Sequence, residues 1–69
     1  MHNEQASLLM GALMKIPMEQ RETIVLHLSA AMTFKQIALM QGTPLPTVQA
    51  RYRYGLDKLR TILKGELKK

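Results

Sequence analysis

The segment from Gln49 to Tyr54, QARYRY, places arginine, glutamine and tyrosine side chains within a single short stretch. Glutamine and arginine carry paired hydrogen-bonding groups that match the edges of bases, and arginine also neutralises phosphate. The net charge of +5 is concentrated in the half of the chain that contains this segment. Residues 1–32 hold two basic and three acidic residues, whereas residues 33–69 hold eight basic and two acidic residues. A basic half is typical of a nucleic-acid binder, although a solvated basic surface gives the same pattern.

Residues suited to catalysis or metal binding are sparse. The chain has no cysteine, and its two histidines, His2 and His27, are far apart. Neither histidine has a second ligand at a spacing that would hold a metal ion, and the five acidic residues form no catalytic pair. The sequence therefore predicts a protein that is not an enzyme and that needs no metal and no cofactor.

Features of membrane insertion and export are missing from the sequence. No apolar run approaches the roughly 20 residues of a membrane span, and the first residues lack the basic start and apolar core of a signal peptide. The absence of cysteine fits a reducing compartment. We therefore expect a cytoplasmic protein that does not bind a membrane.

The apolar spacing predicts an all-α fold, a compact four-helix domain with a C-terminal helix-turn-helix, in a chain long enough for one small domain. The expected helices cover about residues 3–15, 18–30, 33–41 and 45–63. Pro17 ends the first helix and begins the second. Thr33 and Gln36 are spaced as a capping box for the third helix, and Gly42 is placed to end it.

Each helix carries an apolar face. In the second helix we expect the buried residues to be Ile24, Val25 and Leu28. In the last helix the spacing by three and four selects Val48, Tyr52, Gly55 or Leu56, Leu59 and Leu63. Gly55 would allow close approach of a neighbouring helix, at a propensity cost of about 1 kcal/mol relative to alanine.

A short helix, a tight turn and a longer basic helix together predict a helix-turn-helix. The turn contains Gly42 and the run Thr43-Pro-Leu-Pro46. If the apolar face of the last helix points inward, the front half of the opposite face points outward. That outer face consists of Gln49, Ala50, Arg53 and Tyr54, with Arg51 at its edge.

Residues 16–28 (IPMEQRETIVLHL) and 32–60 (MTFKQIALMQGTPLPTVQARYRYGLDKLR) resemble region 4 of bacterial sigma factors, and most of all the small extracytoplasmic-function type. The resemblance runs from about residue 8 to residue 63. Its motif positions are Ile16, Pro17, Gln20, Arg21, Glu22, Gln36, Ile37, Ala38, Gly42, Thr47, Val48, Arg51, Tyr54 and Leu59. The chain departs from the family at Gln36, at Thr43-Pro44 and at Tyr54, where arginine is common. Arg53 offers a guanidinium from the adjacent position.

The resemblance implies binding to the promoter −35 element and docking on the flap of the RNA polymerase β subunit. Base contacts would come from Gln49, Ala50, Arg53 and Tyr54. Phosphate contacts would come from Arg21, Thr33, Lys35, Thr47 and Arg51. The apolar docking surface would comprise Met10, Met14, Leu39 and Met40, with Leu13 and Leu26 assigned equally well to the core. An anti-sigma factor is a further partner of the kind that the family binds.

Nothing in the chain resembles region 2, the part of a sigma factor that melts the −10 element. We therefore expect either an excised C-terminal domain of a sigma factor, which we favour, or a stand-alone region 4 protein. Two other classes remain open. A helix-turn-helix regulator of the two-component effector type usually has Lys-His after Thr-Val, where this chain has Gln49-Ala50-Arg51. A protein-interaction module is disfavoured by the basic last helix.

Overall fold

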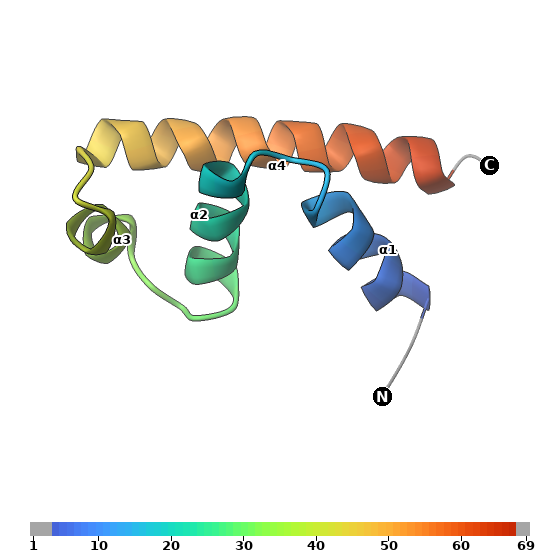
Figure 1. The fold of residues 1–69 in the computed structure, drawn as a ribbon, viewed down its shortest axis with the longest axis horizontal. Helices are drawn as coiled ribbons and strands as arrows, with labels where there is room; N and C mark the ends of the chain where they lie inside the picture. The colour runs from blue at the N-terminus through green and yellow to red at the C-terminus, as the bar shows by residue number, and fades with distance from the viewer. Residues whose placement is uncertain (1–3, 68–69) are drawn as a thin grey trace.

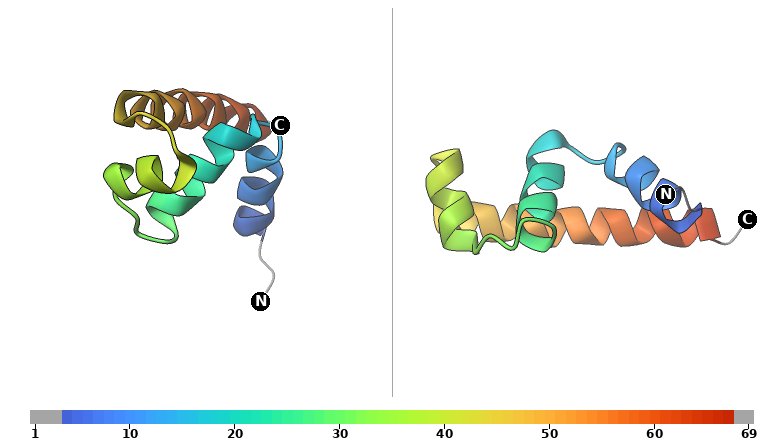
Figure 2. Two further views of the ribbon diagram at one scale, coloured as in Figure 1. Left: turned by 60° about the vertical axis from the view of Figure 1, so that its left-hand side comes forward. Right: turned by 90° about the horizontal axis from the view of Figure 1, so that it is seen from below.

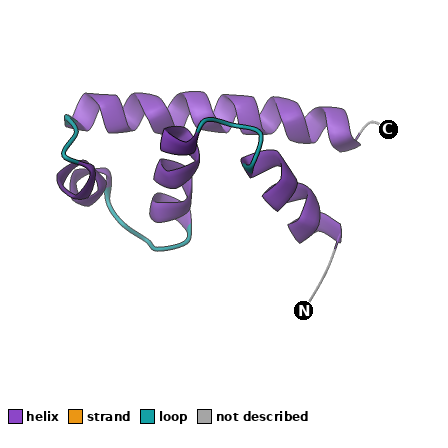
Figure 3. Ribbon diagram, in the orientation of Figure 1, coloured by secondary structure: helices purple, strands orange, loops and turns teal. Residues whose placement is uncertain are grey.

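The computed structural model describes residues 4–67, without the side chains of residues 66 and 67, and within that range it contains helices and no strand. The helices are α1 (Glu4–Leu13), α2 (Met18–Leu28), α3 (Phe34–Gln41) and α4 (Leu45–Leu67) (Figures 1 and 3). Helices α3, α2 and α1 lie in that order along one side of α4, as the rotated views also show (Figure 2). The prediction of an all-α, four-helix fold is confirmed.

The connection between α1 and α2 begins earlier than the sequence predicts, at Leu13 instead of about residue 15. A residue that precedes proline is disfavoured in the helical conformation, so the chain must leave the helix before Pro17. It does so through a tightened turn, in which the Lys15 N–H donates to the Ala12 carbonyl at 3.0 Å and the Ile16 N–H to the Leu13 carbonyl at 3.4 Å. This turn carries Ile16 into the core, where it is buried.

The prediction for the buried face of α2 is only partly correct. Ile24 is buried, but Val25 and Leu28 are 39% and 61% exposed, and the other buried residue is Thr23. The Thr23 hydroxyl donates to the Glu19 carbonyl at 2.9 Å, which allows a polar side chain to be buried there. Helix α2 therefore packs through a narrower face than its apolar pattern suggests.

Helix α2 also ends two residues before the expected position, at Leu28. Ala31 has a φ of 56°, in the left-handed region that non-glycine residues seldom adopt. The chain reverses here, and the Met32 N–H donates back to the Leu26 carbonyl at 3.0 Å. The reversal places the start of α3 beside the end of α2.

The predicted boundaries of α3 are confirmed by its two caps. The Thr33 hydroxyl accepts from the Gln36 N–H at 3.1 Å, and the Gln36 side chain accepts from the Thr33 N–H at 2.9 Å, which completes a capping box. Gly42 ends the helix with φ 62° and ψ 38°, a left-handed conformation that glycine adopts without steric cost.

Helix α4 is longer than expected and continues to Leu67 instead of ending at about Leu63. Its 23 residues correspond to about 35 Å at 1.5 Å per residue. The front half packs against α2 and α3, and the back half packs against α1 through Leu59, Ile62 and Leu63. Because α1 supports this back half, the helix does not end where the helix-turn-helix does.

Buried apolar side chains form a cluster between α1, α2 and α4, and the expected apolar seam of α4 contributes to it. The buried members are Ala12, Leu13, Ile16, Ile24 and Leu59, with Tyr52, Leu56, Ile62 and Leu63 half-buried around them. Ile37 of α3 and Val48 of α4 are fully buried, at 0% exposure each. The helix-turn-helix is thus fixed by few side chains.

Three rings add a second contact among α2, α3 and α4. The rings of His27 and Phe34 stack with centroids 4.2 Å apart, and Tyr52 meets both rings edge-on at 4.9 Å and 5.0 Å. The Nδ1 atom of His27 lies 2.8 Å from the Met32 carbonyl oxygen, so Nδ1 carries the proton and donates. Tyr52 is therefore a core residue, as the sequence predicts.

Gly55 allows α4 to lie close to α2. A Cβ atom at this position would lie 2.8 Å from Ile24 Cδ1 and 3.1 Å from Gln20 Cβ. We expect Gly55→Ala to lower the free energy of unfolding by about 1 kcal/mol, because overpacking outweighs the gain in helix propensity. Chemical denaturation followed by circular dichroism measures the change.

Gly65, in the same helix, provides the control for this prediction. A Cβ atom there would meet no atom within 4 Å. Gly65→Ala should therefore raise the free energy of unfolding by about 1 kcal/mol through propensity alone. Equal stabilisation by both substitutions would contradict the close approach of α2 and α4 at Gly55.

Candidate nucleic-acid interface

The turn between α3 and α4 is made by Gly42, Thr43 and Pro44. The Thr43 N–H donates to the Ala38 carbonyl at 3.0 Å, which closes the end of α3. The Pro44 carbonyl then accepts from the N–H groups of Thr47 and Val48, at 3.0 Å and 3.2 Å, and these are the first bonds of α4. As predicted, Gly42 lies outside the helices and Pro44 immediately precedes α4. The turn is short, so α4 has a fixed direction relative to α3.

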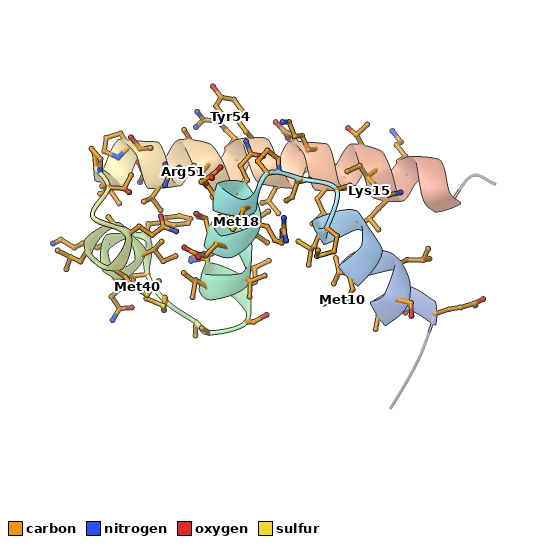
Figure 4. The ribbon with its side chains drawn as sticks, in the orientation of Figure 1. Met10, Lys15, Met18, Met40, Arg51 and Tyr54 are labelled. Carbon is orange, nitrogen blue, oxygen red and sulfur yellow. The ribbon has the colours of Figure 1, made fainter. Side chains whose placement is uncertain are left out.

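The outer face of α4 lies opposite the helices that pack on it. Gln49 and Arg53 are exposed, Tyr54 is 55% exposed, and Ala50 is half-buried. Figure 4 shows Tyr54 on the side of α4 that points away from α2. The four residues that the family resemblance assigns to base contacts therefore lie on one face, in the front half of the helix.

Two of these side chains interact with each other. The Arg53 guanidinium carbon lies 5.3 Å from the centroid of the Tyr54 ring, within the range of a cation–π contact. Further along the helix, Asp57 pairs with Arg60, with Oδ1 and Nη1 3.7 Å apart. Arg53 thus contacts an aromatic ring instead of the nearby carboxylate.

The residues assigned to phosphate contacts occupy different positions. Lys35, in the first turn of α3, is exposed, and Thr47, in the first turn of α4, is half-buried. Thr33 is also exposed, and its hydroxyl oxygen accepts the capping bond described above. These three residues lie at the N-terminal ends of the two helices of the helix-turn-helix, where backbone N–H groups also favour anions.

Arg51 takes part in a network inside the helix-turn-helix. It is half-buried, and its Nη1 donates to the side-chain oxygen of Gln41 at 3.4 Å. The Gln41 Nε2 donates in turn to Glu22 Oε1 at 2.8 Å and to the Thr23 hydroxyl at 3.5 Å. Figure 4 shows Arg51 close to α2. The Arg51 side chain therefore connects α4 with α3 directly, and with α2 through Gln41.

A family model, Sigma-70, region 4, matches residues 12–61, from the end of α1 to the back half of α4. The chain belongs to the Sigma-70 region 4 family. Membership implies a non-catalytic domain that binds the promoter −35 element and RNA polymerase in transcription initiation. Comparisons with curated proteins and with solved structures found no match.

Residues 4–67 of the region 4 domain contain neither a membrane-spanning helix nor a metal-binding cluster. Among the helices of residues 4–67, none is long and apolar enough to cross a membrane. The same part of the chain holds no group of three or more histidine, cysteine, aspartate or glutamate residues that could bind a metal ion.

Arg21 of the region 4 domain lies beside the connection between α1 and α2. Its Nη1 donates to the Met14 sulfur at 3.3 Å, and its Nη2 donates to the Ile16 carbonyl at 3.3 Å. The side chain is half-buried. Two of its donors are therefore engaged within the chain, and its assignment to a phosphate stays a prediction.

The apolar residues assigned to polymerase docking are all exposed, but they form two pairs. Met10 and Met14 belong to α1 and the turn that follows it, and Leu39 and Met40 belong to α3. Helix α2 lies between these helices (Figure 1). Leu13 is buried in the core and Leu26 is half-buried. The sequence gives no indication that α2 separates the two pairs.

Sequence reasoning missed Gln41 and the interaction of Arg53 with Tyr54. Gln41 connects three helices by its side chain, but its partners are 10 to 19 positions away along the chain. No local pattern marks such a residue. Arg53 and Tyr54 are adjacent, but neighbouring residues of a helix point about 100° apart, so adjacency alone does not predict contact.

Proposed function

We propose that this domain is the C-terminal, −35-binding part of a sigma factor of the extracytoplasmic-function type, acting in the cytoplasm at the nucleoid. Helix α4 would enter the major groove with its front half, as recognition helices do. The observation that carries this proposal is the outer face of α4, where glutamine and arginine are exposed beside a tyrosine that is 55% exposed. Gln49, Ala50, Arg53 and Tyr54 would meet base edges.

Phosphate contacts would hold the helix in register on either side of the groove. Lys35 and Thr47 are the best-supported candidates, because they lie at the starts of α3 and α4 and their side chains remain accessible. Thr33 would contribute from the same end of α3. Arg51 and Arg21 would reach phosphate with the guanidinium N–H groups that their internal bonds leave free.

The second part of the proposal is docking on the flap of the polymerase β subunit. A single recognition helix buries little surface, so the free domain should bind DNA weakly and with a steep dependence on salt. Docking would raise the effective concentration of α4 at the promoter without adding a base contact. The exposed methionine and leucine side chains support this idea, since methionine adapts to a partner surface. An anti-sigma factor would compete for such a surface.

Substitutions of Arg53 and Lys35 test the DNA-binding part of the proposal. Arg53→Ala should relax base preference within the −35 element and cost about 1–3 kcal/mol on the preferred sequence. Lys35→Ala should weaken binding to all sequences alike, because phosphate carries no sequence information. Fluorescence anisotropy with a matched and a scrambled duplex measures both effects.

Two results would contradict this reading. If Arg53→Ala weakens both duplexes equally, Arg53 contacts only phosphate. If the chain binds DNA tightly as a dimer without polymerase, a stand-alone helix-turn-helix regulator becomes the better assignment. Sedimentation of the chain with and without duplex provides the oligomeric state for the second case.

A further inference from the structure

The Arg53 guanidinium lies beside the ring of its neighbour in the chain, Tyr54. Adjacent side chains of an α-helix diverge by about 100°, so two adjacent residues do not normally meet. The 5.3 Å separation between the Arg53 guanidinium carbon and the Tyr54 ring centroid therefore requires the arginine to lean across the helix face. A guanidinium beside the face of an aromatic ring is attracted by the ring's electron density.

The alternative partner for Arg53 is engaged elsewhere. Asp57 lies four positions after Arg53, a spacing at which opposite charges often pair on a helix. In the structure Asp57 pairs with Arg60 at 3.7 Å, and no ion pair joins Arg53 to a carboxylate among the described residues. The Tyr54 ring is thus the group beside which the Arg53 guanidinium lies.

Ala50 leaves room for this arrangement. Side chains of a helix lean toward its N-terminus, so Arg53 and Tyr54 both lean over the turn that contains Ala50. Position 50 lies between positions 53 and 54 around the helix, because it precedes them by three and four residues. The side chain of Ala50 is only a methyl group, so it does not block the two larger side chains. Ala50 is half-buried, which fits coverage by those neighbours.

The position of the guanidinium determines what it can recognise. Because the Arg53 guanidinium leans toward Tyr54, it lies over the middle of the outer face of α4. This is the part of a recognition helix that approaches the floor of the groove. The guanidinium's planar pair of donors matches two adjacent acceptors, and in the major groove guanine alone presents such a pair, O6 and N7. An arginine that is held in place loses less conformational freedom when it binds.

We propose that Tyr54 is a positioning residue that holds the Arg53 guanidinium for recognition of a guanine in the −35 element. This inference rests on the proposed function and replaces its assignment of Tyr54: the ring acts through Arg53 and makes no base contact of its own. The ring face does the positioning, so the phenol hydroxyl is not required. Tyr54→Phe and Tyr54→Leu therefore form a matched pair, since both remove the hydroxyl and only the second removes the ring.

The experiment begins with the wild-type chain and a pool of randomised duplexes, from which the preferred sequence is selected. The guanine whose preference Arg53→Ala abolishes is then replaced, and Kd is measured for both duplexes with each variant. Wild type and Tyr54→Phe should discriminate between the duplexes by about 5- to 150-fold. Tyr54→Leu should lose about 3- to 30-fold of that discrimination, the range expected for a cation–π contact.

A measurement without DNA tests the same arrangement. Ring currents of Tyr54 should shift the Arg53 side-chain protons upfield in the NMR spectrum of the free chain. The shift should persist in Tyr54→Phe and disappear in Tyr54→Leu. Circular dichroism should be unchanged in both variants, because Tyr54 is 55% exposed and lies outside the core.

The outcomes separate this inference from the function on which it rests. If wild type shows no base preference, both are overturned. If wild type and Arg53→Ala behave as expected but Tyr54→Leu discriminates as well as wild type, the positioning role is overturned and the −35 function stands. Equal weakening of both duplexes by Tyr54→Leu would also overturn it, because the ring would then contribute only general affinity.

Discussion

Ile37→Ala is expected to unfold the helix-turn-helix. Ile37 is 0% exposed and is the only buried residue of α3. Truncation of a buried isoleucine to alanine typically costs about 2–5 kcal/mol, which includes the cavity left behind. A chain of 69 residues has a total stability of roughly 3–10 kcal/mol, so the loss removes a large part of it. Loss of helical signal and a lower midpoint in urea would measure the effect.

Leu39→Ala provides the matched control for Ile37→Ala. Leu39 lies two positions later in the same helix and is 81% exposed. Its truncation should change the free energy of unfolding by no more than about 0.5 kcal/mol, as is usual at surface positions. A similar loss of stability in both variants would mean that α3 packs through a different face from the one described.

A negative charge in the proposed docking surface is expected to abolish binding to the polymerase flap. Met14→Asp or Met40→Asp would bury a carboxylate against an apolar partner, at a cost of several kcal/mol. The cost should be smaller for Met14→Asp, because Arg21 Nη1 lies beside position 14 and can pair with the new charge. Affinity for a flap peptide should fall by about 100-fold or more, at 1.4 kcal/mol for each factor of ten. DNA binding by the free domain should stay close to that of wild type for Met40→Asp, since Met40 does not lie on the outer face of α4. Titration with a flap peptide and with a duplex measures both affinities.

Met14 follows α1 and Met40 belongs to α3, so α2 lies between the helices that carry them (Figure 1). A partner helix that contacts both Met14 and Met40 must lie across α2, where Met18 is 64% exposed. Figure 4 shows Met18 between Met10 and Met40 along the domain. We therefore expect both aspartate variants to lose binding. Loss in only one variant would place the partner on one side of α2.

Gln5→Asp is the control for the aspartate variants. It adds the same charge to the first turn of α1, at an exposed position where the helix dipole favours an acidic residue. It should leave flap binding and stability unchanged. If the folded Met14 and Met40 variants bind the flap as wild type does, the docking surface lies elsewhere.

Local signals in the sequence determined the order of the helices, the bounds of α3 and the turn that follows it. The capping box of Thr33 and Gln36, the left-handed Gly42 and the helix-compatible Pro44 each act over three or four residues, so the sequence displays them directly. The seam of α4 was equally readable, because a helix that packs along its length needs apolar residues every three or four positions. The outer face that carries Gln49 and Arg53 followed as its complement.

Tertiary packing decided what local signals leave open. Val25 and Leu28 are apolar but exposed, because α2 is covered only on the side that meets α3 and α4. The back half of α4 stays helical because α1, distant in sequence, packs against it. Burial and helix length of this kind depend on which segments meet in space, and no residue pattern within one helix contains that information.

The candidate nucleic-acid interface was also only partly predictable from the sequence. Which residues lie on the outer face of α4 follows from the sequence, since helical periodicity fixes their direction. What each side chain contacts does not follow from it. Arg51 binds Gln41 and Arg53 leans on Tyr54, although both arginines belong to one basic segment. Long flexible side chains choose among partners within reach, and only the folded arrangement of α2, α3 and α4 determines which partners those are.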